Sequence, residues 1–422
     1  MVGGSGSARH HAPGSRSIAH APEDVADDHS AGAYRPHLEA VGSRRVTDRL
    51  RLPRLSRRHL PLLVVGAAVV FAFAYVLFIA TPPPDTGGGN WRTTTFGAAI
   101  HDPASFLRIV LDSITFAGAL FIVASGFALI FGLMRVVNMA HGSFYLLAGY
   151  IAYEIQQSMT GQGFAIPTSE VNTWEWVAPL LVAAPCIAVV GLVTQQAFLR
   201  WNQGQELRQA LITIAISVII ADQIIAHFPR ATSTVAQKFG GNAVSLSWPG
   251  WTDRFVNLHV AGVEYSLARL VVLFLGVAVA AALWLWLYRT KTGMVIRAGV
   301  DDQKMAAALG INIQRTFAIA FVVGSALAAF GAVVWASQAN IASGQDGQWL
   351  LNSLVVVIVG GMGSIFGAAA GAVLYAFVLN FSATYLPTTG SNCCTQYSIV
   401  FTFGLSALVL AFRPRGLFGR PG

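Results

Sequence analysis

Residues 131–149 read FGLMRVVNMAHGSFYLLAG, and they form the most informative stretch of the chain. Apolar residues flank this stretch on both sides, as they do in helices that cross a bilayer. Its middle is different, because Arg135, Asn138 and His141 are polar and Gly142 is flexible. Irregular backbone at membrane depth is tolerated only where protein buries it or where it lines a water-filled cavity. The stretch therefore predicts a transmembrane pass that is interrupted near its start.

A second break, Gly360-Gly361-Met362-Gly363-Ser364, ends a later apolar run. The two broken passes are five passes apart, so they cross in opposite directions, as in an inverted repeat. The stretch Phe121-Ile-Val-Ala-Ser125 also resembles Phe321-Val-Val-Gly-Ser325. Interrupted passes in two halves indicate a solute pathway near the midplane, although small residues would also let the helices pack closely. The residues predicted to lie on this pathway are Asn138, His141, Gly142, Gly360, Gly361, Gly363 and Ser364, together with the intramembrane acid Asp222.

The composition predicts a membrane protein. Hydrophobic residues make up 55% of the 422 residues and charged residues 11%, against about 25% charged residues in a typical soluble protein. A soluble protein of this size could not cover its surface with so few charged residues, whereas a protein surface that contacts the bilayer needs none. Three cysteines cannot form a disulfide framework, and the basic residues form no stripe for nucleic acid. The expected fold class is all-α and polytopic.

The chain divides into three predicted parts. Residues 1–58 are rich in Gly, Ser, Ala, Pro and Arg and predict a disordered, basic N-terminal tail. Residues 59–81 predict an extra transmembrane helix, and residues 105–422 form the main membrane domain. Hydropathy predicts nine more passes, which makes about ten in all. Their approximate ranges are 113–134, 139–158, 177–199, 209–228, 266–288, 316–337, 348–361, 364–385 and 396–412.

The distribution of positive charge predicts the orientation. With a cytoplasmic N-terminus, 21 of the 27 lysines and arginines lie on the inner side and six on the outer side. This is the asymmetry that inner-membrane proteins show. Ten passes then place the N- and C-termini on the cytoplasmic side of a multi-pass protein.

The longest predicted inward loop is Arg289–Arg315. Asp301 is predicted to cap a short helix that starts at Asp302, because the following residues are strong helix formers. Gly310 is predicted to end that helix. The result is an amphipathic helix of about two turns, which is either a plain connector or a docking site for a partner protein.

Catalytic chemistry is not expected in this chain. It contains no Gly-x-x-x-x-Gly-Lys-[Ser/Thr] phosphate loop, so it cannot bind and split ATP by that route. His141 has neither a nucleophile nor an orienting acid in a matching pattern. We therefore predict no enzyme activity, no metal site and no cofactor on this chain.

Several stretches together resemble the branched-chain amino acid ABC transporter permeases. Residues 131–142 and 144–150 resemble the first signature of that family. Residues 305–312 are similar to the family's coupling segment, and residues 359–368 to its third signature. The ending Arg413-Pro-Arg-Gly416-Leu-Phe-Gly419 is also similar. The resemblance covers residues 110–422, so the domain at 105–422 is expected to be an ABC importer permease.

The resemblance implies the transmembrane subunit of an importer in the cell inner membrane. ATP would be bound by separate ABC ATPase subunits, a second homologous permease would complete the pore, and an extracytoplasmic solute-binding protein would deliver the substrate. Membrane lipid is the remaining partner, and nucleic acid is not one. The residues that the resemblance assigns to ATPase coupling are Arg297, Asp301, Asp302, Ala306, Ala307, Gly310 and Asn312.

Three features depart from the family pattern, and the first is that the coupling segment has no obvious counterpart of the family's Glu. Ser143 stands where the family often has Glu, and Asp222 stands where amide residues are common. Two alternatives to a branched-chain amino acid importer stay open. One is an importer of urea or short amides, because related permeases share the Asn-x-Ala-His-Gly run. The other is a proton-coupled secondary carrier with Asp222 and Glu154 as relay groups.

Overall fold

The computed structural model describes residues 103–160, 171–227, 244–257, 263–385, 397–413 and 416–418, all within one compact unit, Leu55–Gly422. The predicted tail at 1–58 and the predicted helix at 59–81 lie outside the described residues.

Helices make up most of the described chain. They are α3 (Pro103–Met134), α4 (His141–Thr160), α5 (Thr173–Val193), α6 (Glu206–His227), α8 (Leu267–Arg289), α9 (Lys291–Asp301), α10 (Gln303–Ala308), α11 (Ile313–Ala336), α12 (Asp346–Gly360), α13 (Ile365–Tyr385) and α14 (Tyr397–Phe412). A π-helical turn, η2 (Thr194–Leu199), and two 3-10 turns, η3 (Arg200–Asn202) and η4 (Gly250–Asp253), complete them. The antiparallel strands β1 (Phe255–Asn257) and β2 (Glu264–Ser266) form a small hairpin, with Phe255 opposite Ser266. The all-α, polytopic class is confirmed.

Each of the nine passes predicted after residue 105 coincides with a helix. Within the described residues, six helices are long and apolar enough to cross a membrane, namely α3, α5 with its continuation, α6, α8, α11 and α13. Helices α12 and α14 are apolar but shorter. Helix α4 has 20 residues of mixed polarity, and more than half of them are buried among its neighbours.

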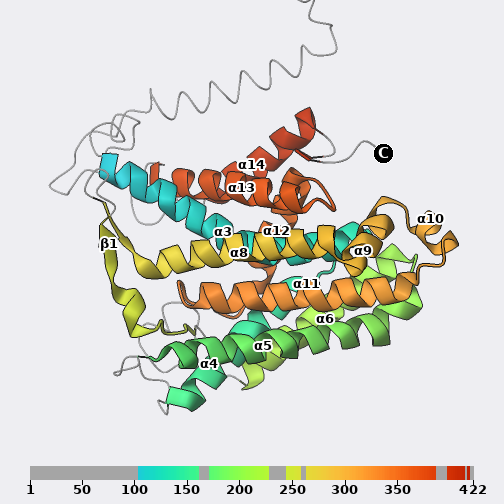
Figure 1. Cartoon of the computed structure of the whole chain (residues 1–422), viewed down its shortest axis with the longest axis horizontal. Helices are drawn as coiled ribbons and strands as arrows, with labels where there is room; N and C mark the ends of the chain where they lie inside the picture. The colour runs from blue at the N-terminus through green and yellow to red at the C-terminus, as the bar shows by residue number, and fades with distance from the viewer. Residues whose placement is uncertain are drawn as a thin grey trace, which may run out of the picture. The chain divides into compact units, whose positions relative to one another are not determined.

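The bundle has two distinct ends (Figure 1), because β1 and α10 lie at opposite ends of the long helices. At the hairpin end, Tyr265 of β2 donates a hydrogen bond to Asp112 near the start of α3. At the loop end, the side-chain amide of Gln303 in α10 donates to the carbonyl of Leu133 near the end of α3. Helix α3 therefore runs from the hairpin end to the loop end, and successive long helices alternate in direction.

The centre of the bundle is the crossing of α3 and α11. These two spans are 78% and 67% buried, whereas the α6 span is 11% buried. Small residues let the two backbones approach, since a Cβ atom added at Gly126 would lie 2.4 Å from the carbonyl oxygen of Gly324. Without a hydrophobic driving force between helices in lipid, such close packing is a main source of association.

We predict that Gly126→Ala destabilises the protein by about 1–3 kcal/mol, because the new methyl group overlaps a backbone carbonyl that no rotamer change can move. The measurement is thermal unfolding of the detergent-purified protein. Gly404→Ala is the matched control, since a Cβ atom added at Gly404 of α14 meets nothing within 4 Å. Equal unfolding temperatures for the two variants would contradict this account of the core.

Candidate functional site: two helix starts inside the bundle

Helix α4 begins inside the bundle. The chain leaves α3 at Arg135, which has a φ of 57°, and returns through residues 136–140 to start α4 at His141. Nε2 of His141 lies 3.1 Å from the carbonyl oxygen of Val123. Val123 lies between Asp112 at the hairpin end and Met134 at the loop end, roughly 16 Å along α3 from Met134. We call this level mid-depth.

Side chains satisfy the backbone of the interrupted segment. The side-chain oxygen of Asn138 accepts a hydrogen bond from the backbone N–H of Ala140 at 3.1 Å. The backbone N–H of Met139 donates to the hydroxyl of Thr213 in α6 at 3.2 Å. Buried backbone polar groups must find such partners. The predicted break is therefore confirmed as a local structure, capped by Asn138 and held by α6.

Helix α12 also begins at mid-depth, beside α4. A Cβ atom added at Gly142 would lie 2.0 Å from the carbonyl oxygen of Asp346, so only glycine fits between the two helix starts. The hydroxyl of Ser143 lies 2.7 Å from the hydroxyl of Ser217 and donates to Oδ2 of Asp346 at 3.2 Å. Ser217 is close to the middle of α6. We call Ser143, Ser217 and Asp346 the mid-depth cluster.

Aromatic rings lie beside the mid-depth cluster. The rings of Tyr145 and Trp349 stack with centroids 4.3 Å apart, and the ring of Trp335 meets that of Trp349 at 5.8 Å. Phe116 of α3 packs edge-on against Trp335 at 5.0 Å. These rings bury the first turns of α4 and α12 against α3 and α11.

The predicted pathway residues at the first break come together, but they are closed off. Asn138 is 3% exposed and His141 is fully buried. Nδ2 of Asn138 and Nδ1 of His141 have no hydrogen-bond partner among the described residues. With Gly142 wedged against Asp346, these three residues shape the helix start, and Asn138 borders a small cavity of about 10 Å³.

The second predicted break lies elsewhere. Gly361 and Gly363 have φ values of 110° and 76°, and a Cβ atom added at Gly132 of α3 would lie 2.6 Å from Cα of Gly363. The hydroxyl of Ser364 accepts a hydrogen bond from the backbone N–H of Gly367 at 3.0 Å, which caps α13. Helix α12 has 15 residues, so its end at Gly360 is roughly 21 Å from its start. The structure does not bring the two breaks together.

The second break holds the end of the described chain. The backbone N–H groups of Leu417 and Phe418 donate to the carbonyls of Val359 and Gly360, each at 2.9 Å. Gly416, with a φ of 79°, lies against Gly361. The motif that resembles the family's ending is therefore part of the loop end of the bundle.

Asp222 does not join either break. It is exposed on α6, five residues beyond Ser217, on the face that also exposes Leu211 and Val218. Neither an ion pair nor a hydrogen bond reaches its carboxylate from the described residues.

The inward loop is two helices, α9 and α10, and its predicted cap is corrected. Asp301 is the last residue of α9, whereas Asp302 caps α10 by accepting from the backbone N–H groups of Lys304 and Met305 at 2.9 and 3.0 Å. The physical reason is that α9 packs against α3, α8 and α11 and keeps Asp301 helical. Gly310 ends the segment with a φ of 84°, as predicted, and Asn312 caps α11 by accepting from Arg315 N–H at 3.1 Å.

Helix α10 presents an apolar surface beyond the bundle. Ala306 is buried, but Ala307 is exposed, and Met305 and Leu309 are 59% and 76% exposed. Exposed apolar groups of this kind mark contacts with other molecules more often than free surface.

A cavity of about 540 Å³ connects the loop helices with the second break. Its lining includes Arg297 and Asp301 of α9 together with Gly363 and Ser364. The guanidinium of Arg297 stacks over the ring of Tyr288 in α8 at 4.3 Å, a cation–π contact that fixes its position. Residues that the sequence assigned to coupling and to the pathway thus share one space at the loop end.

Sequence reasoning missed Asp346, Ser217 and the aromatic rings. Asp346 stood at the edge of a predicted pass and was not distinguished from an ordinary helix start. The available signal was the mostly polar stretch 337–348, in which Asp346 is the one charged residue and which directly precedes an apolar run. Among the described residues, no group of three or more His, Cys, Asp or Glu side chains is placed to hold a metal ion.

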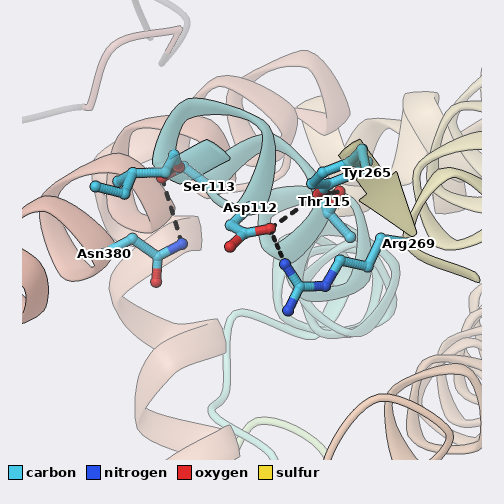
Figure 2. A network of polar contacts seen from close by, with 7 residues as sticks. Asp112, Ser113, Thr115, Tyr265, Arg269 and Asn380 are labelled. Carbon is cyan, nitrogen blue, oxygen red and sulfur yellow. Dashed lines mark hydrogen bonds and ion pairs between the residues drawn. The ribbon is translucent and has the colours of Figure 1, made fainter. Parts of the chain in front are cut away.

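A separate polar network ties the hairpin end together (Figure 2). Asp112 of α3 pairs with Arg269 of α8 and accepts a hydrogen bond from the Tyr265 hydroxyl at 3.0 Å, while Thr115 lies 2.9 Å from the same hydroxyl. Burial raises the pKa of Tyr265 to about 12, so the phenol stays protonated and donates to Asp112. Because Asp112 and Arg269 are both substantially exposed, their ion pair is worth little by itself.

Tyr265→Phe is expected to destabilise the protein by about 1–3 kcal/mol, because it leaves Asp112 and Thr115 without the buried hydroxyl that joins them. Thermal unfolding at neutral pH measures the effect. Tyr288→Phe serves as the control, since its ring stays under Arg297 and its hydroxyl makes no described hydrogen bond. If Tyr265→Phe unfolds at the wild-type temperature, the network does not hold the hairpin end.

A bundle of apolar helices with two helix starts at mid-depth defines a multi-pass α-helical membrane protein. The chain belongs to the family described as branched-chain amino acid transport system / permease component, whose sequence profile matches residues 109–410. This confirms the resemblance found in the sequence motifs.

Individual relatives are similar along most of their length. BraD of Pseudomonas aeruginosa, a high-affinity branched-chain amino acid transport system permease protein, is 26% identical over 323 residues, covering 75% of this chain and 96% of BraD. LivH of Escherichia coli K12 is 26% identical over 319 residues, covering 75% and 96%. LivM of the same organism is 23% identical over 326 residues, covering 76% of this chain and 72% of LivM.

Proposed function

We propose that this chain is the transmembrane subunit of an ABC importer that carries branched-chain amino acids across the cytoplasmic membrane. The observation that carries the proposal is family membership over residues 109–410, together with relatives named as permeases of branched-chain amino acid transport. The chain itself does no chemistry in this proposal. ATP is bound and hydrolysed by separate ABC ATPase subunits.

A second, homologous permease completes the pore in this proposal. The chain has similarity both to LivH and to LivM, which are named as permease proteins of one kind of system. The exposed face of α6 supports a partner there, because it carries Asp222 inside a membrane span. A charged group facing lipid costs about 2.5–3.5 kcal/mol at the centre of a span, so such groups usually face protein or water. An extracytoplasmic binding protein and membrane lipid are the other partners.

The loop end is the cytoplasmic side in this proposal, with both termini there and about ten passes when the helix at 59–81 is included. Among the described residues, nine lysines and arginines lie toward the loop end and three toward the hairpin end. Positive charge concentrates on the cytoplasmic side of inner-membrane proteins. The alternation of helix directions supports the same assignment.

An inverted repeat relates α3–α6 to α11–α14 in this proposal. Helix α3 packs on α13 as α11 packs on α5, and α3 packs on α12 as α11 packs on α4. Likewise α4 packs on α5 and α6 as α12 packs on α13 and α14. Ser125 and Ser325, equivalent in the sequence match, are both buried and donate to the carbonyls of Ile122 and Val322, three residues earlier.

Alternating access would be driven from the loop end. The coupling residues Arg297, Asp301, Asp302, Ala306, Ala307, Gly310 and Asn312 belong to α9, α10 and their connections. Gln303 of α10 contacts the carbonyl of Leu133, and Val300 of α9 lies against Gly363. Pressure from an ATPase on the exposed surface of α10 would therefore reach both α3 and the Gly360–Ser364 break. Rocking of one half against the other would follow.

The first test reconstitutes this chain in proteoliposomes with its second permease, its ATPase subunits and its binding protein. We expect uptake of labelled leucine that requires ATP and that excess valine suppresses but excess urea does not. Suppression by urea would favour the short-amide importer instead. Uptake by the purified chain alone under a pH gradient would favour the secondary carrier and would contradict the proposal.

The second test concerns coupling. Gly310→Trp and Arg297→Glu should each lower leucine uptake roughly tenfold or more, while the complex stays assembled in the membrane. The first change places a bulky side chain in a strained turn beside α10, and the second reverses a charge in the cavity between α9 and the break. Gly204→Trp is the matched control, because Gly204 has a similar φ of 80° and a Cβ atom added there also meets nothing within 4 Å. Normal transport by both coupling variants would mean that the ATPases act elsewhere.

A further inference from the structure

The mid-depth cluster places a carboxylate inside the membrane without a cation. Asp346 is half-buried, and within the described part of the chain no lysine or arginine pairs with it. Its described side-chain contact is the hydroxyl of Ser143, which in turn meets Ser217. Acids at this depth are costly and usually face a cavity or pair with another group. The described residues therefore leave Asp346 without a counter-ion, which is the chemistry of a cation-binding site.

Asp346 and Ser217 are partly exposed, and they adjoin a surface that the described part of the chain does not cover. Gly347 and Gln348 in the first turn of α12 are exposed, and Leu351 one turn further is 46% exposed. Few residues of α6, which reaches the cluster through Ser217, are buried, and Val218 beside Ser217 is 62% exposed. A face with polar groups at this depth adjoins water or protein, because exposed polar groups are not left in lipid.

Two buried polar atoms of α4 also lack partners. The hydroxyl of Tyr145 and Nδ1 of His141, both in the first turns of α4, are fully buried and make no hydrogen bond among the described residues. The Tyr145 ring stacks on Trp349 in the first turn of α12. Native proteins leave few such groups unsatisfied, and those that remain call for a water or a ligand.

The first turn of α12 adds a complementary feature. The first N–H groups of a helix have no partner within the helix, and that end of the helix carries a partial positive charge. A Cβ atom added at Gly347 would meet nothing within 4 Å, so this backbone is open to a ligand. The carboxylate of Asp346 and these N–H groups lie within one helical turn. An α-amino acid carries both an ammonium, which suits the carboxylate, and a carboxylate, which suits these N–H groups.

We propose that Asp346, with Ser143 and Ser217, binds the ammonium group of the transported amino acid at mid-depth, on a face of α6 and α12 that the second permease covers. This inference rests on the proposed function and makes it more specific. The solute then passes along this face, and Asn138, His141 and Gly142 stay behind it as the packed support of the site.

The first arm of the test measures leucine uptake by the reconstituted importer at saturating binding protein. Asp346→Asn keeps the size of the side chain and an oxygen that can accept from Ser143 but removes its charge, and it should lower uptake roughly tenfold or more. Asp346→Glu should recover part of the loss. The control is Asp253→Asn in the exposed turn η4 at the hairpin end. Wild-type uptake by Asp346→Asn would overturn the inference while leaving the proposed function intact, whereas a wild-type complex that imports no leucine would contradict the proposed function itself.

The second arm measures water access and does not depend on transport activity. In a background with Cys186, Cys393 and Cys394 replaced by Ser, Gln348→Cys should react with a membrane-impermeant thiol reagent, and leucine should slow the reaction in the complete importer. Val400→Cys on α14, which is 61% exposed in the isolated chain, is the lipid-facing control and should stay unreacted. A Gln348→Cys variant that is as unreactive as Val400→Cys would overturn the inference, even if Asp346→Asn had failed to assemble.

Discussion

Backbone that leaves a helix inside a membrane must find its hydrogen-bond partners within the protein, and the rest of this structure depends on how that requirement is met. The chain between α3 and α4 is irregular at depth, yet its N–H groups are taken by Asn138 and by Thr213 of α6. The ring of His141 then contacts the carbonyl of Val123 on α3. These contacts are possible because α3 is held firmly against α11 through Gly126 and Gly324. The close crossing of two helices thus supports two helix starts beside it.

Polar groups are sorted by depth along the bundle. At the hairpin end, Asp112, Tyr265 and Arg269 join α3, β2 and α8 in a partly exposed network. At mid-depth, Asp346 accepts a hydrogen bond from the hydroxyl of Ser143, which in turn meets the hydroxyl of Ser217. At the loop end, glycine contacts and the cavity beside Arg297 connect α9 to the break after α12. Helix α12 spans the last two levels without interruption, so a displacement of the break at Gly360 would be carried by one rigid helix to Asp346.

Local chemistry explains where sequence reasoning succeeded. Gly310 was predicted to end a helix because a left-handed φ at that point favours glycine, and the structure has it at 84°. The capping residue was assigned one position too early, since Asp301 and Asp302 are equally good caps as isolated side chains. What separates them is the packing of α9 on α3, α8 and α11, which keeps Asp301 helical, and no local pattern reports that packing.

The sequence by itself determined that this is an α-helical membrane protein of the branched-chain permease family, and it located nine helices and two breaks. Those results follow from hydrophobic length, turn residues and motifs, all of which act over a few neighbouring positions. Only the tertiary structure decided which polar residues share a space. Gly142 and Asp346 are about 200 positions apart in the sequence yet lie in contact, whereas Gly142 and Gly360, which belong to two breaks that look alike in sequence, lie at opposite ends of α12. The depth of a residue and the neighbours that its side chain faces depend on how the helices pack, because packing is set by contacts between segments far apart in the sequence.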